Sequence, residues 1–176
     1  MPSYASTANF DLSIDEIVEE AFERCGLQDR TGYQLKTARR SLNLLLAEWS
    51  NRGLNLWTIK KQTASLTANT TSLSGTDLYG SGANAASEIV DITDLVIRDA
   101  NNNEFSTTPI SRSTYLNYTV KTTSGRPSQF YFEKTINPTL YLYPAADQAY
   151  TVVFYAMLRM KDSGAYTNNN EVPFSF

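Results

Sequence analysis

The sequence predicts an α+β protein, in which an N-terminal antiparallel helical hairpin is followed by an antiparallel β-sheet or a small β-sandwich. Three observations indicate this class. Apolar residues recur at spacings of three and four up to residue 56, and this period shortens toward two after residue 57. The links between the later segments are too short for parallel crossovers. The expected domains are a helical hairpin (1–56), a β domain with a long loop at 67–88 (57–161) and a C-terminal tail (162–176).

The first predicted helix begins after Ser13, which forms a capping-box spacing with Glu16. The apolar positions that follow have helical spacing: Ile14, Ile17, Val18, Ala21, Phe22 and Cys25. We expect Cys25 to be a buried apolar residue of this stripe. Gly26 is expected to end the helix, because glycine adopts the left-handed backbone of a C-terminal cap.

A second capping box, Thr31–Gln34, predicts the start of another helix. Gly53 is expected to end this helix. Its apolar residues again recur at spacings of three and four: Leu35, Ala38, Leu42, Leu45 and Trp49, with Leu46 widening the stripe. The two helices are joined by about five or six residues, a link that favours an antiparallel hairpin.

The later elements follow from β-forming composition and alternation. The segment 67–88 is rich in Ser, Thr, Gly and Asn and is expected to be an exposed loop. A turn is expected at 101–103, with the chain then returning through Phe105 to Ile110, and a short helix is expected over 111–117. The last three strands are expected to form an antiparallel meander. The predicted strands are Trp57–Leu66, Ile89–Arg98, Gln129–Glu133, Thr139–Tyr143 and Tyr150–Met160.

Composition excludes several classes of function. The 15 basic and 18 acidic residues give a net charge of −3, which argues against a salt-driven nucleic-acid binder. The absence of histidine excludes Ser-His-Asp and Cys-His catalysis and imidazole metal sites. One cysteine allows neither an internal disulfide nor a cysteine-rich zinc site. No run of 18 apolar residues and no signal-peptide pattern is present. We expect a non-enzymatic protein without cofactor, metal or membrane, synthesised in the cytoplasm.

Opposite charges separate onto the two predicted helices. Carboxylates gather on the first helix and cations on the second, and such faces pair either within one hairpin or between copies of it in a ring. A catalytic role for the carboxylates is the weaker interpretation, because acidic residues in the first turns suit the helix dipole. The candidate subunit-interface residues are Glu16, Glu19, Glu20, Glu23, Lys36, Arg39 and Arg40.

Two further features suggest surfaces for partners. Lys60 and Lys61 are candidates to face DNA, although a solvated face is the commoner explanation of a short basic run. The chain also contains 11 Tyr, 8 Phe and 2 Trp, many of them on both faces of the predicted strands. One aromatic face of these strands is expected to pack against the core. The other is expected to be covered by another surface, because tyrosine is favoured at interfaces. A carbohydrate-binding β module is an alternative that would use exposed aromatic rings as a stacking platform.

Several segments resemble one protein family. They are Asp15–Phe22 with Cys25-Gly26, Ala38–Trp49 with Gly53–Trp57, Gly125-Arg126-Pro127, Leu140–Pro144 and Tyr150–Met160. These segments are similar to the head–tail adaptor (connector, tail-accessory or head-completion) proteins of tailed bacteriophages, especially short-tailed ones. The helix that ends in Glu-Trp-Ser, followed by Gly-Leu-Asn-Leu-Trp, is the most specific part of the resemblance.

The resemblance implies a structural virion protein at the head–tail junction, or neck. Such adaptors form a ring, usually of twelve copies, beneath the portal protein, extend the channel for double-stranded DNA without sequence specificity, and dock a tail nozzle or tail tube protein. The family continues with further helices after a segment matched here by Glu171-Val172-Pro173, and this sequence stops there. The candidate docking residues are Tyr79, Val172, Pro173, Phe174 and Phe176. Another kind of neck or tail-tube component is the alternative within phages.

Overall fold

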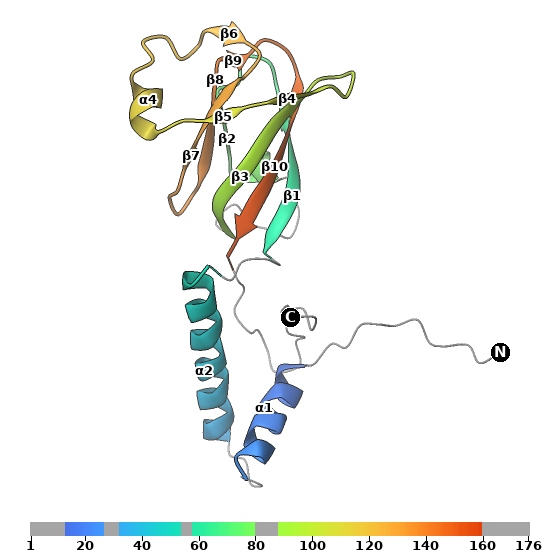
Figure 1. Cartoon of the computed structure of the whole chain (residues 1–176), viewed down its shortest axis with the longest axis vertical. Helices are drawn as coiled ribbons and strands as arrows, with labels where there is room; N and C mark the ends of the chain where they lie inside the picture. The colour runs from blue at the N-terminus through green and yellow to red at the C-terminus, as the bar shows by residue number, and fades with distance from the viewer. Residues whose placement is uncertain (1–12, 27–31, 54–57, 80–87, 160–176) are drawn as a thin grey trace, which may run out of the picture. The chain divides into compact units, whose positions relative to one another are not determined.

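The computed structural model describes residues 13–26, 32–53, 58–79 and 88–159 (Figure 1). The described chain divides into two compact units. One contains the two N-terminal helices, and the other comprises residues 58–159. The N-terminal helices followed by antiparallel sheets confirm the predicted α+β class.

Helix α1 (Ile14–Arg24) is held at its start by the predicted capping box. The Ser13 hydroxyl accepts a hydrogen bond from the Glu16 amide at 3.3 Å, and the Glu16 carboxylate accepts one from the Ser13 amide at 2.9 Å. Ile14 and Val18 are its buried residues. Cys25 is exposed, so the expectation that it is buried is wrong. The helix has already ended at Arg24, and the chain turns away through Gly26, which has φ +72°.

Helix α2 (Gly32–Asn51) contacts α1 and is followed by Gly53 with φ +78°. Leu46 is its most buried apolar residue, at 3 % exposure. Leu45, which the predicted stripe places on the buried face, is 40 % exposed, and the neighbouring Leu44 is also exposed. The apolar face of α2 is thus only partly covered. Thr31, the expected cap of this helix, lies outside the described residues.

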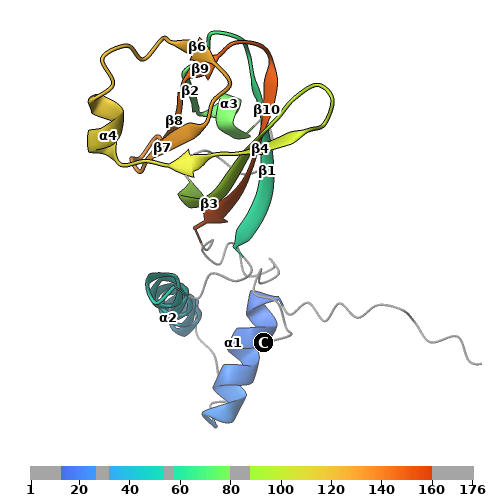
Figure 2. The same ribbon diagram turned by 45° about the horizontal axis from the view of Figure 1, so that its top comes forward.

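The second unit is a β-sandwich (Figures 1 and 2). Its first sheet has the spatial order β1 (Ile59–Leu66), β10 (Tyr150–Leu158), β3 (Ile89–Arg98), β4 (Glu104–Ser106), and all of its pairs are antiparallel. The second sheet has the order β2 (Ser72–Ser74), β8 (Thr139–Tyr143), β7 (Gln129–Glu133), β5 (Thr108–Pro109). Short parallel pairs join β5 to β7 and β6 (Ser124–Gly125) to β9 (Ala145–Ala146).

The core of the sandwich follows from alternation along the strands. In β7 and β8, Phe130, Phe132, Leu140 and Leu142 are buried, and the residues between them are half-buried. These side chains join those of the first sheet, where Phe154 of β10 is fully buried, in one apolar cluster. The sheets therefore pack face to face on their apolar sides.

Two sequence-based expectations are wrong in this unit. Part of the predicted loop 67–88 is ordered, because it contains β2 and helix α3 (Thr76–Tyr79) and buries Leu73 and Leu78 in the core; residues 80–87 lie outside the described part. The predicted meander is also incorrect. Strands β7 and β8 pair with each other, but β10 crosses to the other sheet and lies between β1 and β3.

The remaining predicted elements are present. Helix α4 (Arg112–Leu116) follows its cap Ser111, whose hydroxyl accepts a hydrogen bond from the Thr114 amide at 3.1 Å. Asn102 has φ +63° in the predicted turn between β3 and β4. Trp57 and Met160, at the ends of two predicted strands, lie outside the described residues.

Candidate interaction surfaces

The carboxylates of α1 are exposed, but two of them already have partners in their own helix. Glu16 belongs to the capping box. Glu20 forms an ion pair of 2.8 Å with Arg24, one turn away. Because both partners of that pair are more than half exposed, it contributes little to stability. Glu19, which also has an interaction partner, and Glu23 complete the acidic surface, and Glu23 has no ion pair within the described residues.

The cations of α2 gather at one place. Lys36, Arg39, Arg40 and Asn43 line an open depression of about 260 Å³. Lys36 and Arg40 are exposed, whereas Arg39 is half-buried. The helix therefore brings the three predicted basic residues together, as their spacing of three and four requires. A depression of this kind offers positive charge to an acidic surface rather than an enclosed site for a small molecule.

The predicted basic pair of β1 is divided between the two faces of the first sheet. Successive side chains of a strand point to opposite faces. Lys60 shares its face with the buried Ala64 and Leu66, and Lys61 lies on the outer face with Thr63. Both lysines are exposed. The two ammonium groups consequently do not form one patch on the sheet.

Five tyrosines form a cluster on the outer face of the second sheet. Tyr131 and Tyr141 stack across β7 and β8 with their ring centroids 5.9 Å apart. Tyr115 of α4 lies against both, with centroid distances of 6.1 and 5.2 Å. Tyr118 stacks on Tyr143 at 4.0 Å, with the ring planes 9° apart.

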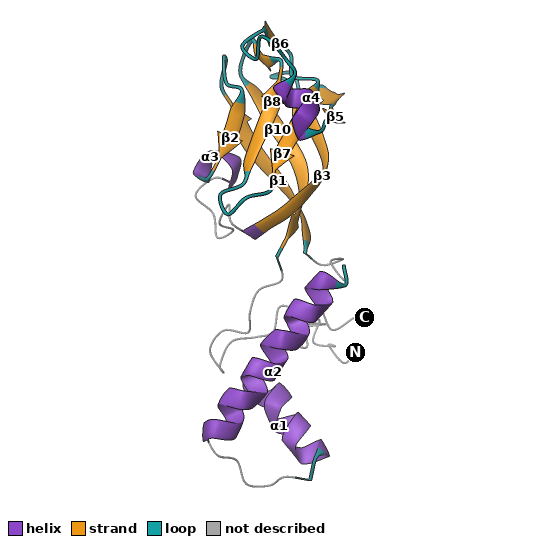
Figure 3. Ribbon diagram, turned by 90° about the vertical axis from the view of Figure 1, so that its left-hand side faces the viewer, coloured by secondary structure: helices purple, strands orange, loops and turns teal. Residues whose placement is uncertain are grey.

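The second aromatic face of these strands is therefore covered by the chain itself. Helix α4 lies outside the layer formed by β7 and β8 (Figures 1 and 3). Tyr115 is only 7 % exposed, and this burial raises the pKa of its phenol. The Lys121 ammonium lies 5.5 Å from the centre of the Tyr115 ring and donates a hydrogen bond to the Tyr118 carbonyl oxygen at 3.1 Å. The sequence indicated that this face requires cover but did not show that α4 supplies it.

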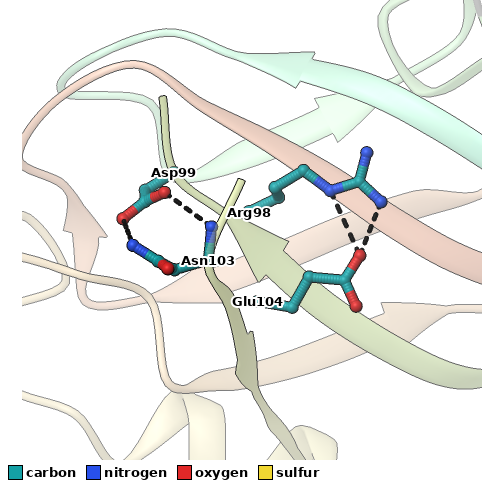
Figure 4. A network of polar contacts seen from close by, with 4 residues as sticks. All are labelled: Arg98, Asp99, Asn103 and Glu104. Carbon is teal, nitrogen blue, oxygen red and sulfur yellow. Dashed lines mark hydrogen bonds and ion pairs between the residues drawn. The ribbon is translucent and has the colours of Figure 1, made fainter. Parts of the chain in front are cut away.

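The turn between β3 and β4 is fixed by polar contacts (Figure 4). The Asp99 carboxylate accepts hydrogen bonds from the amides of Asn101 and Asn103 and from the Asn103 side chain, at 2.8 to 2.9 Å. The side-chain bond from Asn103 is the main reason why the pKa of Asp99 is lowered. The Arg98–Glu104 ion pair joins the two strands beside the turn, and its hydrogen bond lowers the pKa of Glu104.

A second depression lies at the end of the sandwich where β3 begins and β10 ends. It measures about 570 Å³, and its lining includes Ile89, Val90, Ile136 and Arg159. Ile136 is 87 % exposed in the turn between β7 and β8. Beside it, Lys134 pairs with Asp91 of β3 at 2.7 Å and so connects the two sheets.

The docking residues predicted from the sequence lie mostly outside the described part. This applies to Val172, Pro173, Phe174 and Phe176. Tyr79 is the last residue of α3. Among the described residues, no three His, Cys, Asp or Glu side chains are placed to hold a metal ion. No helix in the same ranges has the length and apolar character needed to cross a membrane.

The comparison with protein families agrees with the resemblance seen in the sequence. Residues 12–174 match the family described as SU10 adaptor protein, and this match spans both structural units. The class of protein defined by the fold and this match is a structural adaptor of bacteriophages. The chain belongs to the SU10 adaptor protein family, a family of phage head–tail adaptors. A search of curated proteins gave no match.

Proposed function

We propose that this protein forms a ring between the portal and the tail of a phage particle, extends the DNA channel and docks the next tail component. The family match over residues 12–174 carries this proposal. We propose the virion neck as the location of the protein, with the portal protein and a tail nozzle or tail tube protein as its partners. The protein acts by holding other components together, without catalysing a reaction.

The charges of the helical unit support assembly from copies of the chain. An acidic surface on α1 and a basic depression on α2 are complementary, and charge complementarity guides partner choice and register. We propose that Glu19 and Glu23 of one copy face Lys36 and Arg40 of the next. The exposed Leu44 and Leu45 of α2 supply apolar surface for such a contact.

The weakly acidic character of the chain is compatible with a DNA conduit. The net charge of the chain is −3, and the described residues of β1 form no continuous basic track for phosphates, because Lys60 and Lys61 point to opposite faces. DNA is then able to pass without being held. We expect no measurable affinity of the isolated subunit for double-stranded DNA at physiological salt, and tight binding would contradict a passive channel.

The mass of the complex with the portal tests the proposal. The purified chain and the portal ring of the same phage are measured separately and together by native mass spectrometry. We expect a monomer or weak oligomer alone and a ring of identical copies on the portal, with twelve as the expected number. Failure to bind the portal ring, or electron microscopy that places the chain elsewhere in the virion, would overturn the proposal.

A further inference from the structure

Within the described residues, the first sheet has two edges without a neighbouring strand in the half in which β3 begins and β10 ends, although helix α3 contacts β1. Strand β4 pairs only with Val96–Arg98 of β3. Within the described residues, the segment Ile89–Leu95 of β3 therefore has a neighbouring strand, β10, on one side only. Strand β1 forms the opposite edge of the sheet. Because both β1 and β3 are antiparallel to β10, they run parallel to each other.

These two edges have opposite charges at the same level of the sheet. Lys61 of β1 is paired in register with Tyr155 of β10, and Tyr155 with Asp94 of β3. All three are exposed and lie on the outer face. The side chains of Lys61 and Asp94 form no ion pair and no hydrogen bond within the described residues, although the charge of Lys61 contributes to the lowered pKa of Glu104. One row of the sheet thus has a cation at one edge and an anion at the other.

Exposed apolar residues lie on the same two edge strands. Ile59 at the start of β1 is 39 % exposed, and Val90 at the start of β3 is 41 % exposed. Contacts between proteins commonly combine apolar and charged residues in this way. The arrangement fits a partner that presents the same two edges in the opposite order.

We propose that a second copy of this chain is that partner, with the β1 edge of one subunit against the β3 edge of the next and Lys61 facing the neighbour's Asp94. The contact uses two different edges, so it is heterologous and closes into a ring when the rotation between copies permits. It rests on the proposed function, because it assigns a contact by which the ring of adaptors assembles.

Side chains, rather than a continuous backbone ladder, form this contact. The pairing of β3 with β10 has irregularities that leave Val90 and Thr93 without register partners. The Ile92 amide donates to the Asp91 carboxylate at 2.9 Å, and the Thr93 hydroxyl donates to the Tyr155 carbonyl at 3.2 Å. Bulges and local hydrogen bonds of this kind prevent an edge from extending indefinitely by strand addition. The pairing of Lys61 with the neighbour's Asp94 then determines the position of the neighbouring subunit along the edge.

Charge reversal tests the pairing. We expect Lys61→Glu, and separately Asp94→Lys, to weaken association between subunits about tenfold, both alone in sedimentation experiments and on the portal ring. The combined variant Lys61→Glu/Asp94→Lys restores the pair and is expected to recover assembly. Lys60→Glu is the matched control, because it makes the same charge change at the adjacent residue on the other face of β1. Equal effects of Lys60→Glu and Lys61→Glu would overturn the proposal.

Disulfide crosslinking tests the geometry directly. In a Cys25→Ser background, Lys61→Cys and Asp94→Cys are combined and the protein is oxidised. Within one chain these positions are two strand spacings apart, about 10 Å, which exceeds the Cα separation that a disulfide allows. Crosslinks therefore report contacts between copies. We expect a ladder of trimers and larger species, while the control Lys60→Cys/Asp94→Cys remains largely monomeric.

The outcomes separate this inference from the proposed function. Monomers only, or dimers only, in the Lys61→Cys/Asp94→Cys experiment would overturn the heterologous contact, even if the chain still forms a ring on the portal. A crosslinked ladder together with no portal binding would support the contact and overturn the proposed function.

Discussion

Asp99 shows how a single side chain fixes the turn between two strands of the first sheet. Its carboxylate accepts three hydrogen bonds, and its pKa lies below the ordinary value of 3.8. Since the native pKa is lowered, the stabilisation is complete above the pKa of the unfolded chain and is lost as the pH falls through the native value. Asp99→Ala should therefore lower the free energy of unfolding at neutral pH, and this deficit should shrink with acidification below about pH 4.

Chemical denaturation at a series of pH values measures this effect. Asp94→Ala is the control, because it removes a carboxylate that has no hydrogen bond within the described residues. A deficit for Asp99→Ala that stays constant through the acid range would show that the turn does not depend on the charged carboxylate.

Ser13 has a comparable role at the start of α1. Its hydroxyl satisfies the Glu16 amide, and without it that amide depends on water. We expect Ser13→Ala to destabilise the helical unit by about 1 kcal/mol. Thermal melts followed by far-ultraviolet circular dichroism measure the change. Ser41→Ala, at an exposed position inside α2, should be neutral or slightly stabilising, because alanine is the better helix former. Equal losses in both variants would contradict the capping role.

At the scale of elements, α4 is a five-residue helix that depends on the sheet beneath it. Tyr115 supplies the contact, since it packs against Tyr131 and Tyr141. A helix this short is not stable alone. We expect Tyr115→Ala to lower the free energy of unfolding of the β unit by about 3 kcal/mol, and Tyr115→Phe to change it by less than about 1 kcal/mol.

Denaturant titration and hydrogen exchange together test this prediction. Faster exchange of the amides of α4 should accompany Tyr115→Ala, while the strands of the first sheet keep their protection. Leu116→Ala is the matched control on the same helix, because Leu116 is 60 % exposed and its truncation should cost less than about 0.5 kcal/mol. The prediction fails if both substitutions have the same effect.

Elements with a strong local signal were predictable, and those defined by distant partners were not. The capping box of α1 and the alternation of β7 and β8 depend only on residues that are close together in the sequence. Strand β2 has a single buried residue, Leu73, and forms because it pairs with β8, far along the chain. Likewise, alternation shows which residues of β10 face the core, but it does not show to which sheet β10 belongs.

The candidate surfaces also differ in whether a local signal or a contact between distant segments defines them. Spacing along one helix was sufficient to place Lys36, Arg39 and Arg40 together. The row that contains Lys61 and Asp94 was not visible, because it exists only after β10 inserts between β1 and β3. Lys60 and Lys61 form a basic pair in the sequence. In β1 they point to opposite faces, because adjacent side chains of a strand alternate.

At the scale of the whole molecule, the path of the chain suggests that the β unit is an insertion with its own core. Residues 58 and 159 are the first and last of this unit, and they lie close together: the Leu158 amide donates to the Thr58 carbonyl at 3.0 Å. Strand β1 is also paired with β10 over its whole length. A unit with adjacent ends and a continuous apolar cluster has the properties of an independently folding domain.

We therefore expect a fragment of residues 58–159 to fold alone and to unfold cooperatively. The control is Phe154→Ala in the same fragment, which removes a fully buried ring shared by both sheets and should cost about 3–5 kcal/mol. In the full chain, this substitution should unfold the β unit while the helical circular dichroism of α1 and α2 persists, because the apolar cluster around Phe154 consists of residues of the β unit. A disordered fragment, or loss of helix and sheet in one transition, would show that the units depend on each other for stability.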